Sequence, residues 1–121
     1  MNLTFYHYNK CKKSRAALDF VRQQGIEPVI INYIEEGISE QTVRHLLNLL
    51  QVSPFEMIRQ NEEFFKENYK LKNLSDEEWI ATMAKYPKLL KRPIVVYGKK
   101  AVLADPPQNA NQVLTVYKQD L

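Results

Sequence analysis

Cysteine is nearly absent from this chain of 121 residues, because Cys11 is the only one. A single cysteine excludes an internal disulfide and predicts a reducing compartment, so we expect a cytoplasmic protein. We also find no apolar run long enough to span a bilayer, no signal peptide and no low-complexity tail. The net charge of +3 favours anionic ligands weakly and is too small to indicate nucleic-acid binding.

The bulk composition is ordinary for a globular protein, with 45% hydrophobic and 26% charged residues. A chain of this length can bury a core without metals or disulfides. We therefore expect a single domain over residues 1–121, with no metal and no bound cofactor.

The first third of the chain predicts a βαβ unit. Residues 2–8 have the β-branched and aromatic content of a strand, and a helical pattern follows at about 12–24 and ends at Gly25. Residues 28–33 form a second strand that is apolar enough to be buried on both faces. Two strands that flank one helix should be parallel.

The middle of the chain, from about 36 to 88, is predicted to be a helical insertion. A helix follows the Ser39 cap. Its apolar face is formed by residues at helical spacing: Val43, Leu46, Leu47 and Leu50.

Three further helices complete this insertion. A short one begins at Ser53-Pro54 with proline in its first turn, and another runs from Glu62 to Tyr69 with the Phe64-Phe65 pair facing inward. The third begins at a capping box of Ser75 and Glu78 and ends at about Lys85.

The final segment returns to strands. Pro93 to Tyr97 is an apolar strand, Gly98-Lys99 makes a tight turn, and Lys100 to Leu103 pairs back as a hairpin. A closing helix spans about 109–118, with Val113, Leu114 and Tyr117 on its inner face. The predicted fold class is therefore α/β, with β-α-β and β-β-α halves on either side of the helical insertion.

Cys11 stands where the first strand gives way to a helix. Unpaired N–H groups and the positive end of the helix dipole favour a thiolate there. A lone cysteine is often only a small buried hydrophobic residue, but this one has basic neighbours on both sides: Lys10, Lys12, Lys13 and Arg15. We interpret Cys11 as a nucleophile.

Lys12 and Lys13 oppose the helix dipole in the first helical turn. An anionic ligand or the thiolate would compensate for them, or both side chains simply extend into solvent. The backbone N–H groups of Lys12, Lys13 and Ser14 could hold an oxyanion without any particular side chain.

Three segments resemble one known family. His7, Cys11, Ser14 and Arg15 form the pattern H-x-x-x-C-x-x-S-R, and residues 58–62 and 86–96 supply two arginine segments. With these segments, in this order, nearly the whole chain resembles the glutaredoxin-coupled arsenate reductases, which have a thioredoxin-like fold with a helical insertion.

The resemblance implies a reaction at one cysteine. Cys11 would attack the substrate, and His7 would contact the thiolate and lower its pKa, although a histidine on the sheet surface is an equal alternative. Ser14 would donate to the thiolate or support the helix start. Because no second thiol is available on the chain, the reductant is external: glutathione as co-substrate, followed by glutaredoxin.

The resemblance also implies an oxyanion site. Arg59 and Arg92 match the arginines that hold arsenate in the family, and Lys12 and Lys13 are further candidates. Pro93 matches a proline whose preceding peptide bond is cis in thioredoxin-like folds.

One position departs from the family pattern. Asp105 stands before Pro106 where the family has a third arginine, and a carboxylate there would repel arsenate and raise the pKa of the cysteine. Either Lys12 or Lys13 replaces the lost charge, or the substrate has changed.

Two alternative functions follow. One is a glutathione-dependent thiol-disulfide reductase without arsenate activity. The other is a stress regulator of the same fold that binds RNA polymerase, although Ser14 excludes the C-x-x-C disulfide switch that many such regulators use. We expect neither a membrane nor a nucleic-acid partner.

Overall fold

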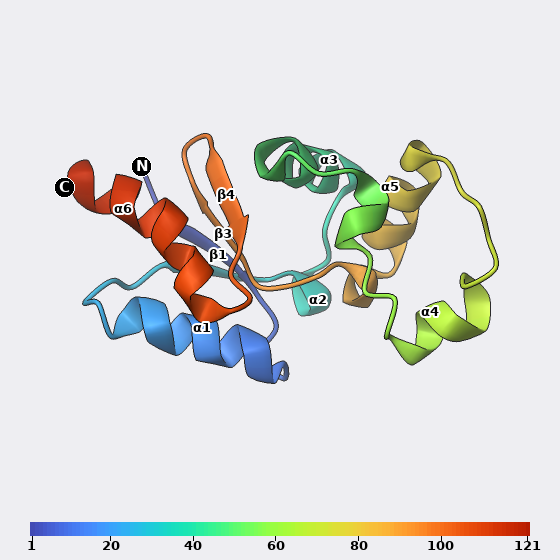
Figure 1. The fold of residues 1–121 in the computed structure, drawn as a ribbon, viewed down its shortest axis with the longest axis horizontal. Coiled ribbons are helices and arrows are strands. Elements are labelled where there is room, and N and C mark those ends of the chain that lie inside the picture. The colour runs from blue at the N-terminus through green and yellow to red at the C-terminus, as the bar shows by residue number, and fades with distance from the viewer. The chain divides into compact units, whose positions relative to one another are not determined.

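A computed structural model describes residues 1–121. The chain divides into two compact units, one made of residues 1–36 and 92–121 and the other of residues 37–91 (Figure 1). None of the helices combines the length and apolar character that crossing a bilayer requires.

The first unit contains a four-stranded sheet in the order β2-β1-β3-β4. Strand β1 (Thr4–His7) is central, pairing parallel with β2 (Val29–Asn32) and antiparallel with β3 (Ile94–Tyr97). β4 (Lys100–Leu103) pairs antiparallel with β3. The predicted parallel βαβ unit and the predicted hairpin are both confirmed.

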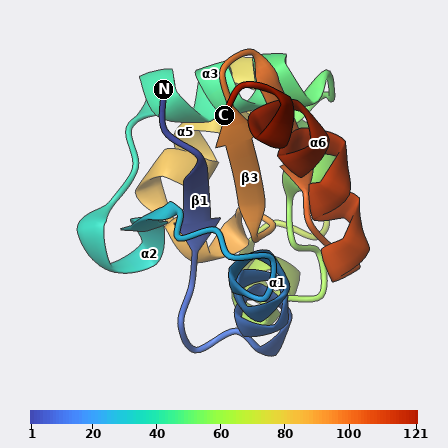
Figure 2. The same cartoon turned by 90° about the vertical axis from the view of Figure 1, so that its left-hand side faces the viewer.

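Helices α1 (Lys12–Arg22) and α6 (Asn111–Gln119) share one apolar core with this sheet (Figure 2). Side chains alternate between the two faces of a strand, so every second residue of β1 and β3 faces these helices. The core contains Leu3, Phe5, Val95 and Tyr97 from the sheet side and Ala17, Leu18, Val21, Val113 and Leu114 from the helices. Two short elements complete the unit, α2 (Tyr33–Glu36) and the 3-10 helix η3 (Pro107–Ala110).

The expectation that the second strand is buried on both faces is wrong. β2 lies at the edge of the sheet, Val29 is 46% exposed, and the other three residues of the strand are only half-buried. Tyr33, which was expected to end this strand, is fully buried and begins α2 instead. An apolar composition does not distinguish an edge strand from a central one, because that difference depends on the order of strands.

The second unit is helical and has no sheet of its own. Its elements are α3 (Glu40–Leu50), η1 (Pro54–Met57), α4 (Glu63–Asn68), α5 (Asp76–Lys85) and η2 (Pro87–Leu89). The predicted caps are confirmed: Ser39 Oγ accepts from the Thr42 N–H at 3.1 Å, and Ser75 and Glu78 form a capping box. An isolated antiparallel bridge joins Ile58 to Leu90.

Two residues of this unit that were predicted to face inward are only half-buried. Phe65 is buried, but Phe64 is only half-buried and packs against the Tyr86 ring with 4.6 Å between centroids. Leu50 is also half-buried, unlike Val43, Leu46 and Leu47 of the same helix. Adjacent helical residues differ by about 100° in direction, so Phe64 and Phe65 do not share one face.

Candidate functional site

Cys11 is the N-cap residue of α1. Its backbone is extended, with φ −95° and ψ 122°, and its carbonyl accepts the Arg15 N–H at 3.0 Å. Its own N–H donates to the Tyr8 carbonyl at 3.0 Å, which fixes the turn between β1 and α1. The half-buried thiol therefore lies at the positive end of an 11-residue helix.

Three groups stabilise a negative charge on the Cys11 sulfur. They are the backbone N–H groups of Lys13 and Ser14 and the guanidinium group of Arg92. Burial raises the pKa of the Cys11 thiol, but these donors and the positive charge of Arg92 outweigh it, so the pKa lies below its ordinary value. The arrangement favours the thiolate, which is the nucleophilic form of cysteine.

Arg92 reaches the thiol from the segment that leads into β3. Arg92 is 8% exposed, and its guanidinium carbon lies 5.1 Å from the centroid of the Tyr8 ring. The Arg92–Pro93 peptide bond is cis, and the Pro93 carbonyl accepts the Ala104 N–H at 2.9 Å. A buried guanidinium group is stabilised by an anion beside it, because burying an unpaired charge is costly.

His7 contacts Ser14, and its expected contact with the Cys11 thiolate stays a prediction. His7 is 5% exposed, and its Nδ1 atom lies 2.6 Å from Ser14 Oγ. Ser14 Oγ also accepts the Tyr8 N–H at 3.1 Å. His7 lies two residues after Phe5 on β1, so its ring is on the same face as Phe5, toward α1.

The charge state of His7 follows from its surroundings. Burial lowers its pKa, and the positive charges of Arg22 and Arg15 lower it further. The imidazole is therefore neutral at neutral pH and supplies no positive charge to the thiolate. Together with the buried Ser14 hydroxyl, it joins the end of β1 to the first turn of α1.

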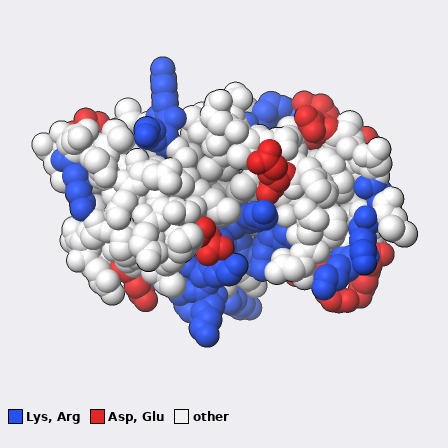
Figure 3. Space-filling model, viewed as in Figure 1, with Lys and Arg blue, Asp and Glu red and all other residues white.

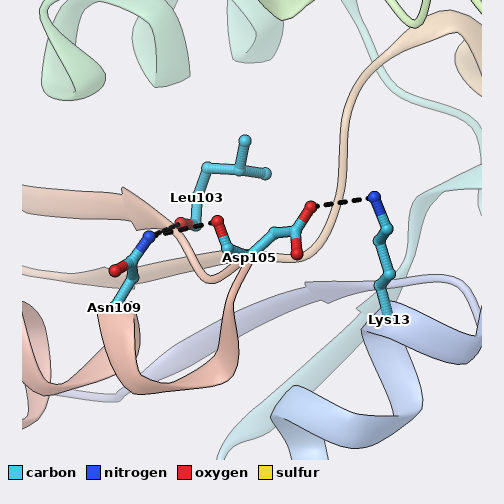
Figure 4. A network of polar contacts seen from close by, with 4 residues as sticks. All are labelled: Lys13, Leu103, Asp105 and Asn109. Carbon is cyan, nitrogen blue, oxygen red and sulfur yellow. Dashed lines mark hydrogen bonds and ion pairs between the residues drawn. The ribbon is translucent and has the colours of Figure 1, made fainter.

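Lys12 and Lys13 differ in their side-chain contacts. Both are exposed, but Lys13 Nζ forms an ion pair with Asp105 Oδ2 at 3.1 Å (Figure 4). Asn109 Nδ2 holds the loop that carries Asp105 by donating to the Asp105 carbonyl at 3.1 Å and the Leu103 carbonyl at 3.5 Å. Sequence reasoning identified Asp105 as an exception but missed its pairing with Lys13.

Arg59 belongs to the second unit, and its part in binding an oxyanion stays a prediction. Its Nη1 atom donates to Glu62 Oε2 at 3.0 Å, and both side chains are about one-quarter exposed. The Arg59 N–H donates to the Leu89 carbonyl at 2.7 Å. No cluster of three or more histidine, cysteine, aspartate or glutamate side chains could hold a metal ion.

Comparison with known proteins links this site to one family. A family model described as the ArsC family matches residues 6–113. The uncharacterized protein YfgD of Escherichia coli is 38% identical over 111 residues, covering 90% of this chain and 93% of YfgD. An arsenate reductase from Haemophilus influenzae is 29% identical over 116 residues, covering 94% of this chain and 100% of that relative.

A solved structure shows the same fold. The structure of an arsenate reductase from Vibrio cholerae superposes with a TM-score of 0.85 at 39% sequence identity, covering 96% of this chain and 98% of that one. The mixed four-stranded sheet with its helices is thus the thioredoxin-like α/β fold.

Proposed function

Because this chain belongs to the ArsC family, we propose that it is an arsenate reductase-like thiol oxidoreductase with Cys11 as its nucleophile. The observation that supports this most directly is the convergence of two backbone N–H groups and Arg92 on the Cys11 sulfur. The same donors that stabilise a thiolate can stabilise the oxygens of a bound oxyanion.

The reaction would begin with attack by the Cys11 thiolate on the arsenic atom of arsenate. A sulfur–arsenic bond forms, and one arsenate oxygen leaves as water after protonation. Arg92 and the N–H groups of Lys13 and Ser14 would hold the remaining oxygens. Arsenic is still in its oxidised form, arsenic(V), at this stage.

Glutathione would then reduce the adduct. Its thiolate attacks the Cys11 sulfur, and the electron pair of the sulfur–arsenic bond leaves with arsenic, which becomes arsenite. The two sulfurs are left as a mixed disulfide. A glutaredoxin thiolate attacks the glutathione sulfur of that disulfide and releases the Cys11 thiolate, which fits a reducing compartment such as the cytoplasm.

Lys12 and Arg59 are proposed as additional cationic ligands of the oxyanion. Lys12 has an exposed side chain at the start of α1, and Arg59 carries the planar donor group that suits oxyanions. If Arg59 has this role, Arg59→Ala should raise the KM for arsenate more than it lowers kcat, since the loss is mainly one of binding.

The direct test is arsenate turnover with glutathione and glutaredoxin. Cys11→Ser should abolish turnover, and Arg92→Met should reduce it strongly. Arg44→Met is a matched control, because Arg44 is exposed and pairs with Glu77 in the second unit. A Cys11→Ser protein that retains full turnover would remove the proposal.

The ion pair of Lys13 with Asp105 favours a second candidate, a glutathione-dependent thiol-disulfide reductase without arsenate activity. A carboxylate that neutralises Lys13 disfavours a doubly charged oxyanion but not a disulfide. Mass spectrometry after treatment with oxidised glutathione should then show one glutathione on Cys11, removable by glutaredoxin, while arsenate gives no turnover.

A further inference from the structure

We propose that Asp105 determines the charge of the substrate that Cys11 accepts, favouring substrates with an ammonium group over multiply charged oxyanions. The inference rests on the proposed role of Cys11 as a nucleophile and deepens it by naming a substrate class. It starts from the ion pair between Lys13 and Asp105.

Lys13 connects this carboxylate to the thiol. Its backbone N–H helps to lower the pKa of the Cys11 thiol, and its side chain reaches Asp105 Oδ2 at 3.1 Å. Asp105 lies in the loop between β4 and η3, and η3 packs against α1. Lys13 therefore contributes its backbone N–H to the surroundings of the thiol and its side-chain charge to the Asp105 carboxylate.

The two side chains of this ion pair differ in solvent exposure. The Lys13 side chain is 67% exposed, whereas that of Asp105 is 35% exposed. Asp105 follows the buried Ala104, and Asn109 Nδ2 donates to the Asp105 and Leu103 carbonyls of the same loop. The Lys13 side chain is the more exposed partner, so it is the one that a ligand can displace from Asp105.

Two of the positive charges near the thiol each face a negative group. Arg92 faces the Cys11 thiolate, and Lys13 faces Asp105. Lys and Arg side chains gather over the start of α1, and acidic side chains border them (Figure 3). A doubly charged oxyanion would have to compete with Asp105 for Lys13.

A substrate ammonium group would be attracted to Asp105 and would compete with Lys13 for this carboxylate. Ion pairs between partly exposed side chains are weak, so a ligand ammonium can replace Lys13 beside Asp105. A small disulfide that carries an amino group, such as the γ-glutamyl end of oxidised glutathione, has this chemistry. In its reaction the Cys11 thiolate bonds to one disulfide sulfur, and the other sulfur leaves as a thiolate.

Two small disulfides of opposite charge test the proposal. Cystamine carries ammonium groups and dithiodipropionate carries carboxylates, and mass spectrometry follows the rate at which each forms a mixed disulfide with Cys11. Asp105→Asn should lower the ratio of the cystamine rate to the dithiodipropionate rate by about fivefold, the scale of one exposed charge pair. Lys13→Met should raise the ratio.

Glu27→Gln is the matched control, because it breaks a similar exposed ion pair with Arg22 at the other end of α1. The control should leave the ratio unchanged. An unchanged ratio in Asp105→Asn would overturn the proposal. If that variant does not fold, an unchanged or lowered ratio in Lys13→Met overturns it instead.

Arsenate turnover separates this proposal from the proposed function. A ratio that shifts as expected in a protein without arsenate turnover supports the role of Asp105 and contradicts the arsenate reaction. Arsenate turnover together with an unchanged ratio supports the arsenate reaction and contradicts the role of Asp105.

Discussion

The Nδ1 atom of His7, in the last residue of β1, lies 2.6 Å from the Oγ atom of Ser14 in the first turn of α1. The contact is buried and ties the strand end to the helix start, with Cys11 in the connection between them. His7 and Ser14 therefore act as positioning residues for the thiol, since the Ser14 backbone N–H lowers the pKa of Cys11.

The first prediction concerns Ser14→Ala. The substitution removes the partner of both the His7 ring and the Tyr8 N–H. We expect the free energy of unfolding to fall by about 1–3 kcal/mol, the cost of leaving buried polar groups unpaired. Urea unfolding measures this, and Thr115→Ala, which removes an exposed hydroxyl bonded to the Asn111 carbonyl, should cost less than about 0.5 kcal/mol.

The second prediction concerns pH and His7. Because the folded-state pKa of His7 is lowered, the unfolded chain binds its proton more readily. The contribution of His7 to the free energy of unfolding should be fully present above about pH 6.5, the pKa of histidine in the unfolded chain. It should be lost as the pH falls below that value. Urea midpoints between pH 8 and pH 5 test this.

His45, the only other histidine, is exposed and provides the control for that experiment. His7→Gln should reduce the loss of stability between pH 7 and pH 5, whereas His45→Gln should retain it. Equal pH profiles for the two variants would contradict the assignment.

The third prediction concerns the reactivity of Cys11. The rate of alkylation by iodoacetamide should reach half its maximum below about pH 8.5, the ordinary cysteine pKa. Arg92→Met should move this midpoint upward, because it removes both a hydrogen bond and a positive charge. Arg44→Met should leave the midpoint unchanged, and a midpoint above that of free cysteine would argue against a thiolate nucleophile.

The fourth prediction concerns the core beneath the site. Leu114 of α6 is fully buried against the sheet. Leu114→Ala should destabilise the protein by about 2–5 kcal/mol, through lost burial and the cavity that remains. Leu71 is 95% exposed, so Leu71→Ala should change stability by less than about 0.5 kcal/mol. Comparable losses in the two variants would show that the core assignment is mistaken.

Most elements of the fold were predictable from local patterns. The strand at β3, the turn at Gly98, the Ser39 cap and the Ser75–Glu78 capping box all depend on neighbours within a few residues. Local chemistry decides such features, so a single sequence is sufficient to find them. The exposure of β2 was not predictable, because it depends on which strands pair.

Some features of the candidate site depend on local sequence, and others depend on the tertiary structure. The sequence by itself determined that one cysteine begins a helix among basic residues, because helix-start signals and charge are local properties. Only the tertiary structure decided that Arg92 donates to this sulfur, that His7 pairs with Ser14 and that Asp105 pairs with Lys13. Arg92 and Asp105 lie some 80 to 95 positions from Cys11 along the chain, and only the pairing of β1, β3 and β4 brings such distant residues together.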